Sequence, residues 1–206
     1  GLPAVLEAML YEMLSAGNHG WTMAPGLLHG AYECLKHHGS QALKDSYLSK
    51  IATGEWLATM CLTEAHAGSD LGQVRTQAVP AGASELGERF EISGSKIFIS
   101  GGEHDLSANI MHLVLARPEG AGPGTKGLSL FIVPRVRSDE GGTLGQLNDV
   151  AVASIEHKMG INGSATCVVN FGDNDACIGV PVGGETELNK GMPQMFVMMN
   201  SARIAV

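Results

Sequence analysis

The chain has 206 residues, of which 44% are hydrophobic and 17% are charged, and these are the proportions of an ordinary globular protein. Its formal net charge of −8 at pH 7, with lysines and arginines scattered along the chain, argues against a surface that binds nucleic acid. No apolar run approaches the ~20 residues of a membrane-spanning helix and no signal peptide opens the chain, so we expect a cytoplasmic protein with no membrane partner.

The N-terminal quarter of the chain has the apolar spacing of helices. Apolar residues recur every three or four positions over 2–14, which predicts a helix that buries one face, and Gly17 is a suitable stop. Two further helices are expected, one over 21–39 and one that Ser40 caps and that ends at Gly54.

From residue 55 onward, short apolar or alternating runs are separated by Gly, Pro and Asn, a pattern typical of strands and turns. The expected strands are 56–62, 74–79, 89–93, 96–100, 110–116, 128–133, 150–156 and 166–171. We expect a tight hairpin at Gly94, and flexible connections over 119–126 and 138–148. Because no helices intervene, the pattern predicts an antiparallel barrel or sandwich rather than a parallel α/β sheet.

Helical spacing returns between Met192 and Ala202, after a loop around 181–184. The predicted class is therefore α+β, with the end of an all-α domain over 1–54, a middle β-domain over 55–183, and the first helix of a C-terminal helical domain over 184–206. The chain starts without Met inside one amphipathic pattern and stops inside another, so we expect a segment of a longer protein.

The strongest local motif is the segment 60–70, Met-Cys-Leu-Thr-Glu-Ala-His-Ala-Gly-Ser-Asp, at the end of the first predicted strand. Gly68 would let backbone amides approach a ligand, and Thr63 and Ser69 supply hydroxyls, which suits a polar ligand edge or a pyrophosphate. The alternative is a plain turn in which Asp70 accepts hydrogen bonds from nearby amides. Spacing alone favours that alternative.

A second motif, 96–102, places Phe98 and Ser100 two residues apart on a strand, so both face the same side. Phe98 could stack on a planar cofactor while Ser100 bonds its rim. The alternative is that Phe98 is a core residue, which is the more common role of a lone aromatic on a strand.

Other chemistries lack the residues they require. The four cysteines and the histidines have no metal-ligand or redox spacing, so we expect buried, reduced thiols and no metal site. The chain has no nucleophile elbow, no Walker A loop and no dinucleotide-binding glycine fingerprint.

In combination, these motifs resemble the acyl-CoA dehydrogenase family over essentially the whole chain. The family's first signature is Thr-Glu-Pro-x-Ala-Gly-Ser-Asp, and residues 63–70 match it except for Ala65 in place of Pro. The second, Trp-Ile-Thr, corresponds to 98–100, and later family segments correspond to 158–160 and 198–203. The details are similar to the bacterial branch that contains 3-methylmercaptopropionyl-CoA dehydrogenase.

The resemblance implies a FAD-dependent α,β-dehydrogenation of an acyl-CoA thioester, in which a Glu removes the α-proton and hydride passes to flavin N5. The implied FAD-binding residues are Met60, Leu62, Thr63, Gly68, Ser69, Phe98 and Ser100. The implied acyl-CoA contacts are Ser69, Asn200 and Arg203. Asn200 departs from the family, which has Asp there.

The resemblance also implies what lies outside the chain. Most family members place the catalytic Glu beyond the position of Val206, and the minority position is occupied here by Ala202, so this segment alone is predicted to be inactive. The implied partners are an acyl-CoA substrate, an electron-transfer flavoprotein as acceptor, and further copies in a homo-oligomer.

Three other functions stay open at this point. An acyl-CoA oxidase-like flavoenzyme would reoxidise rapidly in air, and a non-enzymatic homologue of the same fold would bind duplex DNA at low salt. A plain β-sandwich interaction module would never take up FAD.

Overall fold

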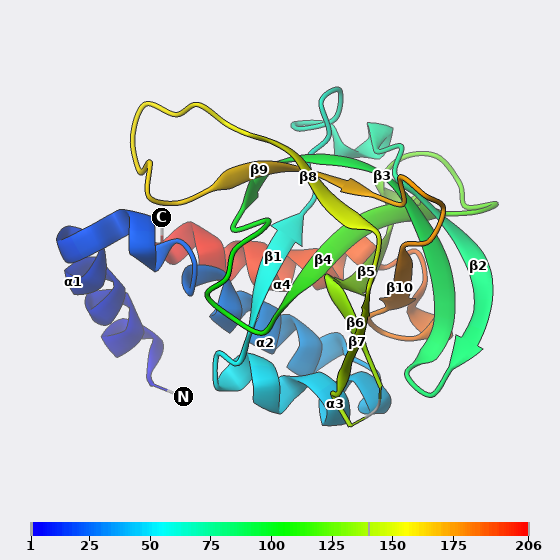
Figure 1. The fold of residues 1–206 in the computed structure, drawn as a ribbon, viewed down its shortest axis with the longest axis horizontal. Helices are drawn as coiled ribbons and strands as arrows, with labels where there is room; N and C mark the ends of the chain where they lie inside the picture. The colour runs from blue at the N-terminus through cyan, green and yellow to red at the C-terminus, as the bar shows by residue number, and fades with distance from the viewer. Residues whose placement is uncertain (1, 140, 206) are drawn as a thin grey trace.

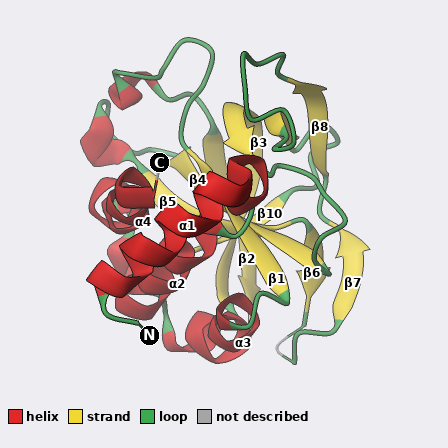
Figure 2. Cartoon of the chain, turned by 90° about the vertical axis from the view of Figure 1, so that its left-hand side faces the viewer, coloured by secondary structure: helices red, strands yellow, loops and turns green. Residues whose placement is uncertain are grey.

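The computed structural model describes residues 2–139 and 141–205 of the chain. Its helices gather on one side of a β-sheet domain (Figures 1 and 2). The helices are α1 (Ala4–Thr22), α2 (Gly26–His38), α3 (Gln41–Ala52) and α4 (Gly191–Ala205). The strands are β1 (Trp56–Cys61), β2 (Gln77–Ser84), β3 (Gly87–Ser100), β4 (Asn109–Pro118), β5 (Ser129–Pro134), β6 (Val136–Ser138), β7 (Leu144–Leu147), β8 (Val150–Ile155), β9 (Thr166–Phe171) and β10 (Ile178–Pro181). Three single-turn helices cover Leu71–Gln73, Thr125–Gly127 and Glu185–Glu187.

The strand pairings close into a ring. β3 pairs with β2, β2 with β4, β4 with β5, β5 with β10, and β10 again with β3. β1 extends the ring from β4, while β9 and β8 extend it from β3. The β1–β4 and β2–β4 pairs are parallel and the other pairs are antiparallel. The predicted α+β class is confirmed, and of the barrel and the sandwich that the sequence left open, the pairings form a closed ring with two parallel pairs.

Strand alternation divides the interior into two hydrophobic cores. On β4, Met111, Leu113 and Leu115 pack with the helices, whereas Val114 and Ala116 point into the ring. The same two-residue period runs along β5. Because both faces are covered, nearly all of β4 and all of β5 are buried, which explains their continuous apolar sequences.

The helical predictions hold for element type and for most boundaries. The Ser40 hydroxyl accepts a hydrogen bond from the Leu43 amide at 3.3 Å, as an N-cap does. Helix α1 continues past the predicted stop at Gly17, but its helical geometry breaks at the next residue, Asn18 (φ −158°, ψ 90°).

The prediction that the first helix buries its apolar face is wrong for this structure. Val5 is 72% exposed and Met13 67% exposed, and the leucines and the other methionine over 2–14 are between 37% and 57% exposed. Figure 2 shows α1 on the outside of the helical layer, with α2 and α4 beneath it. The amphipathic spacing specified a helix correctly, but no segment of the described chain covers its apolar stripe.

The predicted hairpin at Gly94 is also wrong. β3 is a single strand of 14 residues that passes straight through Gly94. Its first half pairs with β2 up to Ser93, and its second half pairs with β9 from Gly94 onward. Gly94 (φ +153°) therefore marks the point where the strand changes partners, a common use of a strand glycine.

Three short strands fall where the sequence predicted loops or gave no element. β6 is unpredicted, β7 lies inside the connection predicted over 138–148, and β10 ends at the loop predicted around 181–184. Glu140, inside that connection, and Val206, at the end of the final predicted helix, lie outside the described residues.

All four cysteines are buried free thiols, as predicted. Within the described ranges, none of the helices has the length and apolarity to span a bilayer.

Candidate functional site

The first motif forms a tight turn at the end of β1. Reciprocal backbone hydrogen bonds between Glu64 and Ala67, at 2.9 and 3.0 Å, close this turn. The turn leaves Gly68 and Ser69 exposed and Thr63 half-buried. Met60 and Leu62 precede it, half-buried and buried respectively. The turn thus presents small and hydroxyl-bearing residues to solvent.

The second motif contains a β-bulge that presents an aromatic ring. The pairing of β3 with β9 shifts register between Lys96 and Ile99, and Phe98 inside this bulge has φ +60°. Positive φ is strained for a bulky side chain. The Phe98 ring is 59% exposed, so it is not the core residue that the alternative interpretation predicted, and Ser100 beside it is half-buried.

The two motifs lie side by side. The Ile97 amide donates to the Thr63 carbonyl at 2.9 Å, and the Lys96 ammonium donates to the Leu62 carbonyl at 3.0 Å. The separation in sequence is more than 30 residues, so only the tertiary fold brings them together. The hydroxyl-bearing turn and the strand segment that carries the exposed Phe98 are consequently adjacent on the surface.

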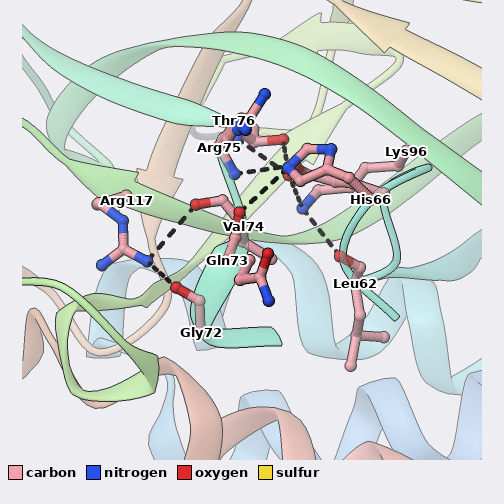
Figure 3. Close-up of polar contacts among 10 residues, drawn as sticks. Leu62, His66, Gly72, Gln73, Val74, Arg75, Thr76, Lys96 and Arg117 are labelled. Atoms are coloured by element: carbon pink, nitrogen blue, oxygen red, sulfur yellow. Dashed lines mark hydrogen bonds and ion pairs between the residues drawn. The ribbon is translucent and has the colours of Figure 1, made fainter. Parts of the chain in front are cut away.

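A buried ion pair lies beneath that surface. Lys96 is 0% exposed and its Nζ lies 2.9 Å from Oε1 of Glu64, itself 4% exposed. The Glu64 carboxylate also accepts the Arg75 amide at 2.8 Å, and the Thr76 amide and hydroxyl at 3.0 and 2.6 Å. Figure 3 shows Lys96, Leu62 and Thr76 converging around this cluster.

The cluster sets the protonation of its members. Burial by itself would raise the pKa of Glu64, but the Lys96 ammonium and the donors on Thr76 and Arg75 outweigh burial and lower this pKa to about 2. Burial lowers the pKa of Lys96, and the Glu64 carboxylate opposes that fall. The carboxylate therefore stays ionised at neutral pH.

The far end of the first motif is stabilised locally. The Asp70 carboxylate accepts the Gly72 amide and the Gln73 side-chain amide, both at 3.0 Å, so the predicted aspartate turn is present. The guanidinium of Arg117 donates to the Gly72 carbonyl at 3.0 Å, which holds this turn against β4 (Figure 3).

Asn200 and Arg203, the two predicted substrate contacts on α4, lie next to one another. The Arg203 guanidinium donates to the Asn200 side-chain oxygen at 3.0 Å and lies 5.6 Å from the centroid of the Phe196 ring. Both residues are exposed. Among the hydrogen bonds of the described residues, none joins this pair to the turn or to the bulge.

Glu64 and Lys96 were not predicted as site residues, although both lie inside the motifs. The signal in the sequence is a lysine at the head of an otherwise apolar run, Lys-Ile-Phe-Ile. No group of three or more His, Cys, Asp or Glu residues in the described part of the chain is arranged to hold a metal ion.

Comparison with known proteins shows which family the chain belongs to. A sequence profile described as "Acyl-CoA dehydrogenase, middle domain" matches residues 59–174. The chain is 45% identical to a butyryl-CoA dehydrogenase of Syntrophomonas wolfei and 46% identical to a 3-methylmercaptopropionyl-CoA dehydrogenase of Ruegeria pomeroyi. The two matches cover 98% and 100% of the chain, which spans only a third (33%) of each relative.

A solved structure has the same fold. The glutaryl-CoA dehydrogenase of Mycobacterium smegmatis in complex with FADH2 matches the whole chain with a TM-score of 0.71 at 22% identity. The match covers 46% of that chain.

Proposed function

This chain belongs to the acyl-CoA dehydrogenase family, and from that premise we propose that it supplies one wall of the flavin site in a FAD-dependent acyl-CoA dehydrogenase. The observation that carries the proposal is the contact between the Thr63 turn and the Phe98 bulge. The experimental structure of the same fold that was solved with FADH2, and the 45–46% identity to named dehydrogenases, support the choice of cofactor and reaction.

The exposed groups fit the chemistry of a flavin ring, which has an apolar face and a polar edge. Phe98 offers an aromatic face at a bulge, a feature that often redirects a side chain beside an active site. Thr63 and Ser69 at the turn and Ser100 on the adjacent strand carry hydroxyls and are half-buried or exposed. A flavin could therefore stack on the ring and bond to the hydroxyls without any rearrangement of the core.

Each residue would contribute positioning rather than proton transfer. When bound, FAD would supply the acceptor for the hydride removed from the acyl group. The Phe98 ring and the apolar side chains of Met60 and Leu62 would exclude water from one face of the site. Ser69 would lie at the border between cofactor and thioester, and the strained bulge would hold the aromatic ring in place before the ligand arrives.

The remaining assignments are proposals from the family. We propose that Asn200 and Arg203 contact the acyl-CoA, that the general base lies outside this chain, and that an electron-transfer flavoprotein accepts the electrons. A homo-oligomer and a role in fatty acid metabolism, in the cytoplasm, complete the proposal.

An anaerobic titration tests this function. The longest native polypeptide that carries these residues is purified, its visible spectrum is recorded, and butyryl-CoA or 3-methylmercaptopropionyl-CoA is added without oxygen. A dehydrogenase is expected to purify yellow and to bleach with one of the two thioesters, then to reoxidise slowly in air. A colourless protein that cannot be loaded with FAD would contradict the proposal, and rapid reoxidation in air would indicate an oxidase.

A further inference from the structure

We infer that the buried Glu64–Lys96 ion pair is a positioning device, which fixes the Thr63 turn and the Phe98 bulge in the relative orientation that a ligand between them requires. The identity of the ligand rests on the proposed function. The inferred role itself depends only on the geometry of the pair.

Lys96 connects the bulge to the turn. It is the last residue of β3 in regular register with β9 before the bulge, paired with Val169. Its Nζ reaches across to the Leu62 carbonyl, just before the turn, and to Glu64 on the turn, rather than along its own strand. The start of the bulge is thereby tied to both sides of Thr63.

Glu64 connects the turn to β2. Its two carboxylate oxygens accept two amides and one hydroxyl from Arg75 and Thr76, just before β2 begins. The backbone of the same residue closes the turn through Ala67. Three chain segments thus meet at one carboxylate, and the position of the exposed Gly68 and Ser69 follows from that meeting.

A hydrogen-bonded ion pair fixes the relative orientation of the turn and the bulge, which apolar packing alone would not do. Buried ion pairs seldom stabilise a fold more than apolar side chains of the same volume would, so a simple stabilising role is a poor explanation. A strained residue such as Phe98 persists only where its surroundings fix the backbone on both sides. Lys96 and the Ile97 amide provide the fixed points on one side, and the Ile99–Cys167 pairing provides the other.

The test separates positioning from stability. The double variant Glu64→Gln/Lys96→Met removes both charges, so it leaves no unpaired buried charge and is expected to unfold cooperatively. Thr76→Val is the matched control, because it removes one bond to the same carboxylate but leaves every link between the turn and the bulge. Both are made in the longest native polypeptide that carries these residues.

Three readouts are compared with the wild type: the thermal transition, the hydrogen exchange of the Ile97 amide, and the visible spectrum and affinity of added FAD. The inference predicts that the double variant folds, exchanges the Ile97 amide about tenfold faster, binds FAD about tenfold more weakly and shifts the flavin band. Thr76→Val is expected to lower the thermal transition and to keep the wild-type exchange and flavin spectrum.

Two outcomes would overturn the inference. A folded double variant with wild-type Ile97 exchange and a wild-type flavin spectrum would show that the pair does not position the site. A double variant that cannot fold would show that the pair acts on stability. A wild-type protein that takes up no FAD would refute the proposed function, while the Ile97 exchange would still decide the role of the pair.

Discussion

At the scale of single residues, the strained backbone of Phe98 is the clearest mark of a site. Its φ of +60° costs conformational free energy. Its ring is 59% exposed, so burial of the side chain offsets little of that cost. A side chain that stabilised only the fold would not be retained in this state. The strain is understandable if the ring serves a ligand.

The strain predicts an inverted order of stability between two variants at this position. Phe98→Ala keeps the strain and loses the ring, whereas Phe98→Gly loses both. Because only glycine adopts positive φ freely, Phe98→Gly should be more stable than Phe98→Ala by about 1 kcal/mol in urea unfolding, the reverse of the usual order in strands. Both variants should bind FAD more weakly than the wild type. A Phe98→Ala variant as stable as Phe98→Gly would remove the evidence for strain.

His112 predicts a pH dependence of folding that is independent of the site. Burial lowers its pKa to about 3, with smaller contributions from His104 and Arg135. Its Nδ1 lies 2.7 Å from the Thr59 hydroxyl, and within the described chain its Nε2 has no hydrogen-bond partner. A histidine that is neutral when folded stabilises the protein fully above the ordinary pKa of 6.5, and this contribution is lost as the pH falls from 6.5 towards 3.

The expected result is a free energy of unfolding that decreases below pH 6.5, with up to about 1.4 kcal/mol per pH unit from this group. His112→Leu should flatten the decrease, because the neutral side chain binds no proton on unfolding. The exposed His157, changed to Gln, is the control and should retain the wild-type slope. Chemical unfolding at several pH values measures the slope of the free energy of unfolding for each protein. Equal slopes in the wild type and in His112→Leu would contradict the lowered pKa of His112.

Some residues of the site could be predicted from the sequence and others could not. The Asp70 turn follows from local hydrogen-bonding chemistry, and the structure has it. The burial of Lys96 could not be predicted from the sequence, because strand alternation marks a charged residue as outward-facing. Its partner Glu64 is 32 residues away, so the ion pair exists only once the fold has formed. The roles assigned to the exposed residues of both motifs stay predictions.

At the scale of elements, Gly94 explains why the predicted hairpin is absent. A glycine between two apolar runs is typical of a turn, and local sequence cannot distinguish a turn from a strand that changes partners. The distinction comes from Thr76 on the neighbouring segment, which packs directly over the glycine. A Cβ at position 94 would lie 2.5 Å from the Thr76 hydroxyl and 2.9 Å from its Cα.

This packing predicts that Gly94→Ala destabilises the fold. The added methyl group must displace the Thr76 backbone, so the free energy of unfolding should fall by about 1–3 kcal/mol. Gly160→Ala is the matched control, because a Cβ there meets nothing within 4 Å, and its effect should stay within about 0.5 kcal/mol. Urea unfolding of the two variants gives the comparison. An equally mild effect at position 94 would contradict the close packing of Thr76 over the glycine.

Helix α1 shows that apolar periodicity predicts a helix but not the burial of its apolar face. The spacing over 2–14 identified the helix correctly, because periodicity depends only on which residues share a face. It could not identify what covers that face, since burial depends on neighbouring elements. In contrast, Leu43, Tyr47 and Ile51 share one face of α3 at the same helical spacing, and this face is buried in the core.

At the scale of the whole molecule, two cores serve two purposes. One core joins the helices to the outer face of β4 and β5, and the other fills the ring of strands. The surface formed by the turn and the bulge lies where β1 ends, beside the half of β3 that has left the ring to pair with β9. The sequence predicted the class and most strands, because their alternation is local, but the closure of the ring depends on pairings between distant strands.

The most direct test of the account is whether a flavin lies against the bulge. Phe98→Trp places the aromatic residue of the family's signature at this position, and its indole reports contact through fluorescence. Apo-protein is titrated with FAD, and the wild-type titration corrects for Trp21 and Trp56. Saturating FAD is expected to remove most of the added emission, since a ring stacked on a flavin is strongly quenched. FAD that binds while the added emission persists would contradict it.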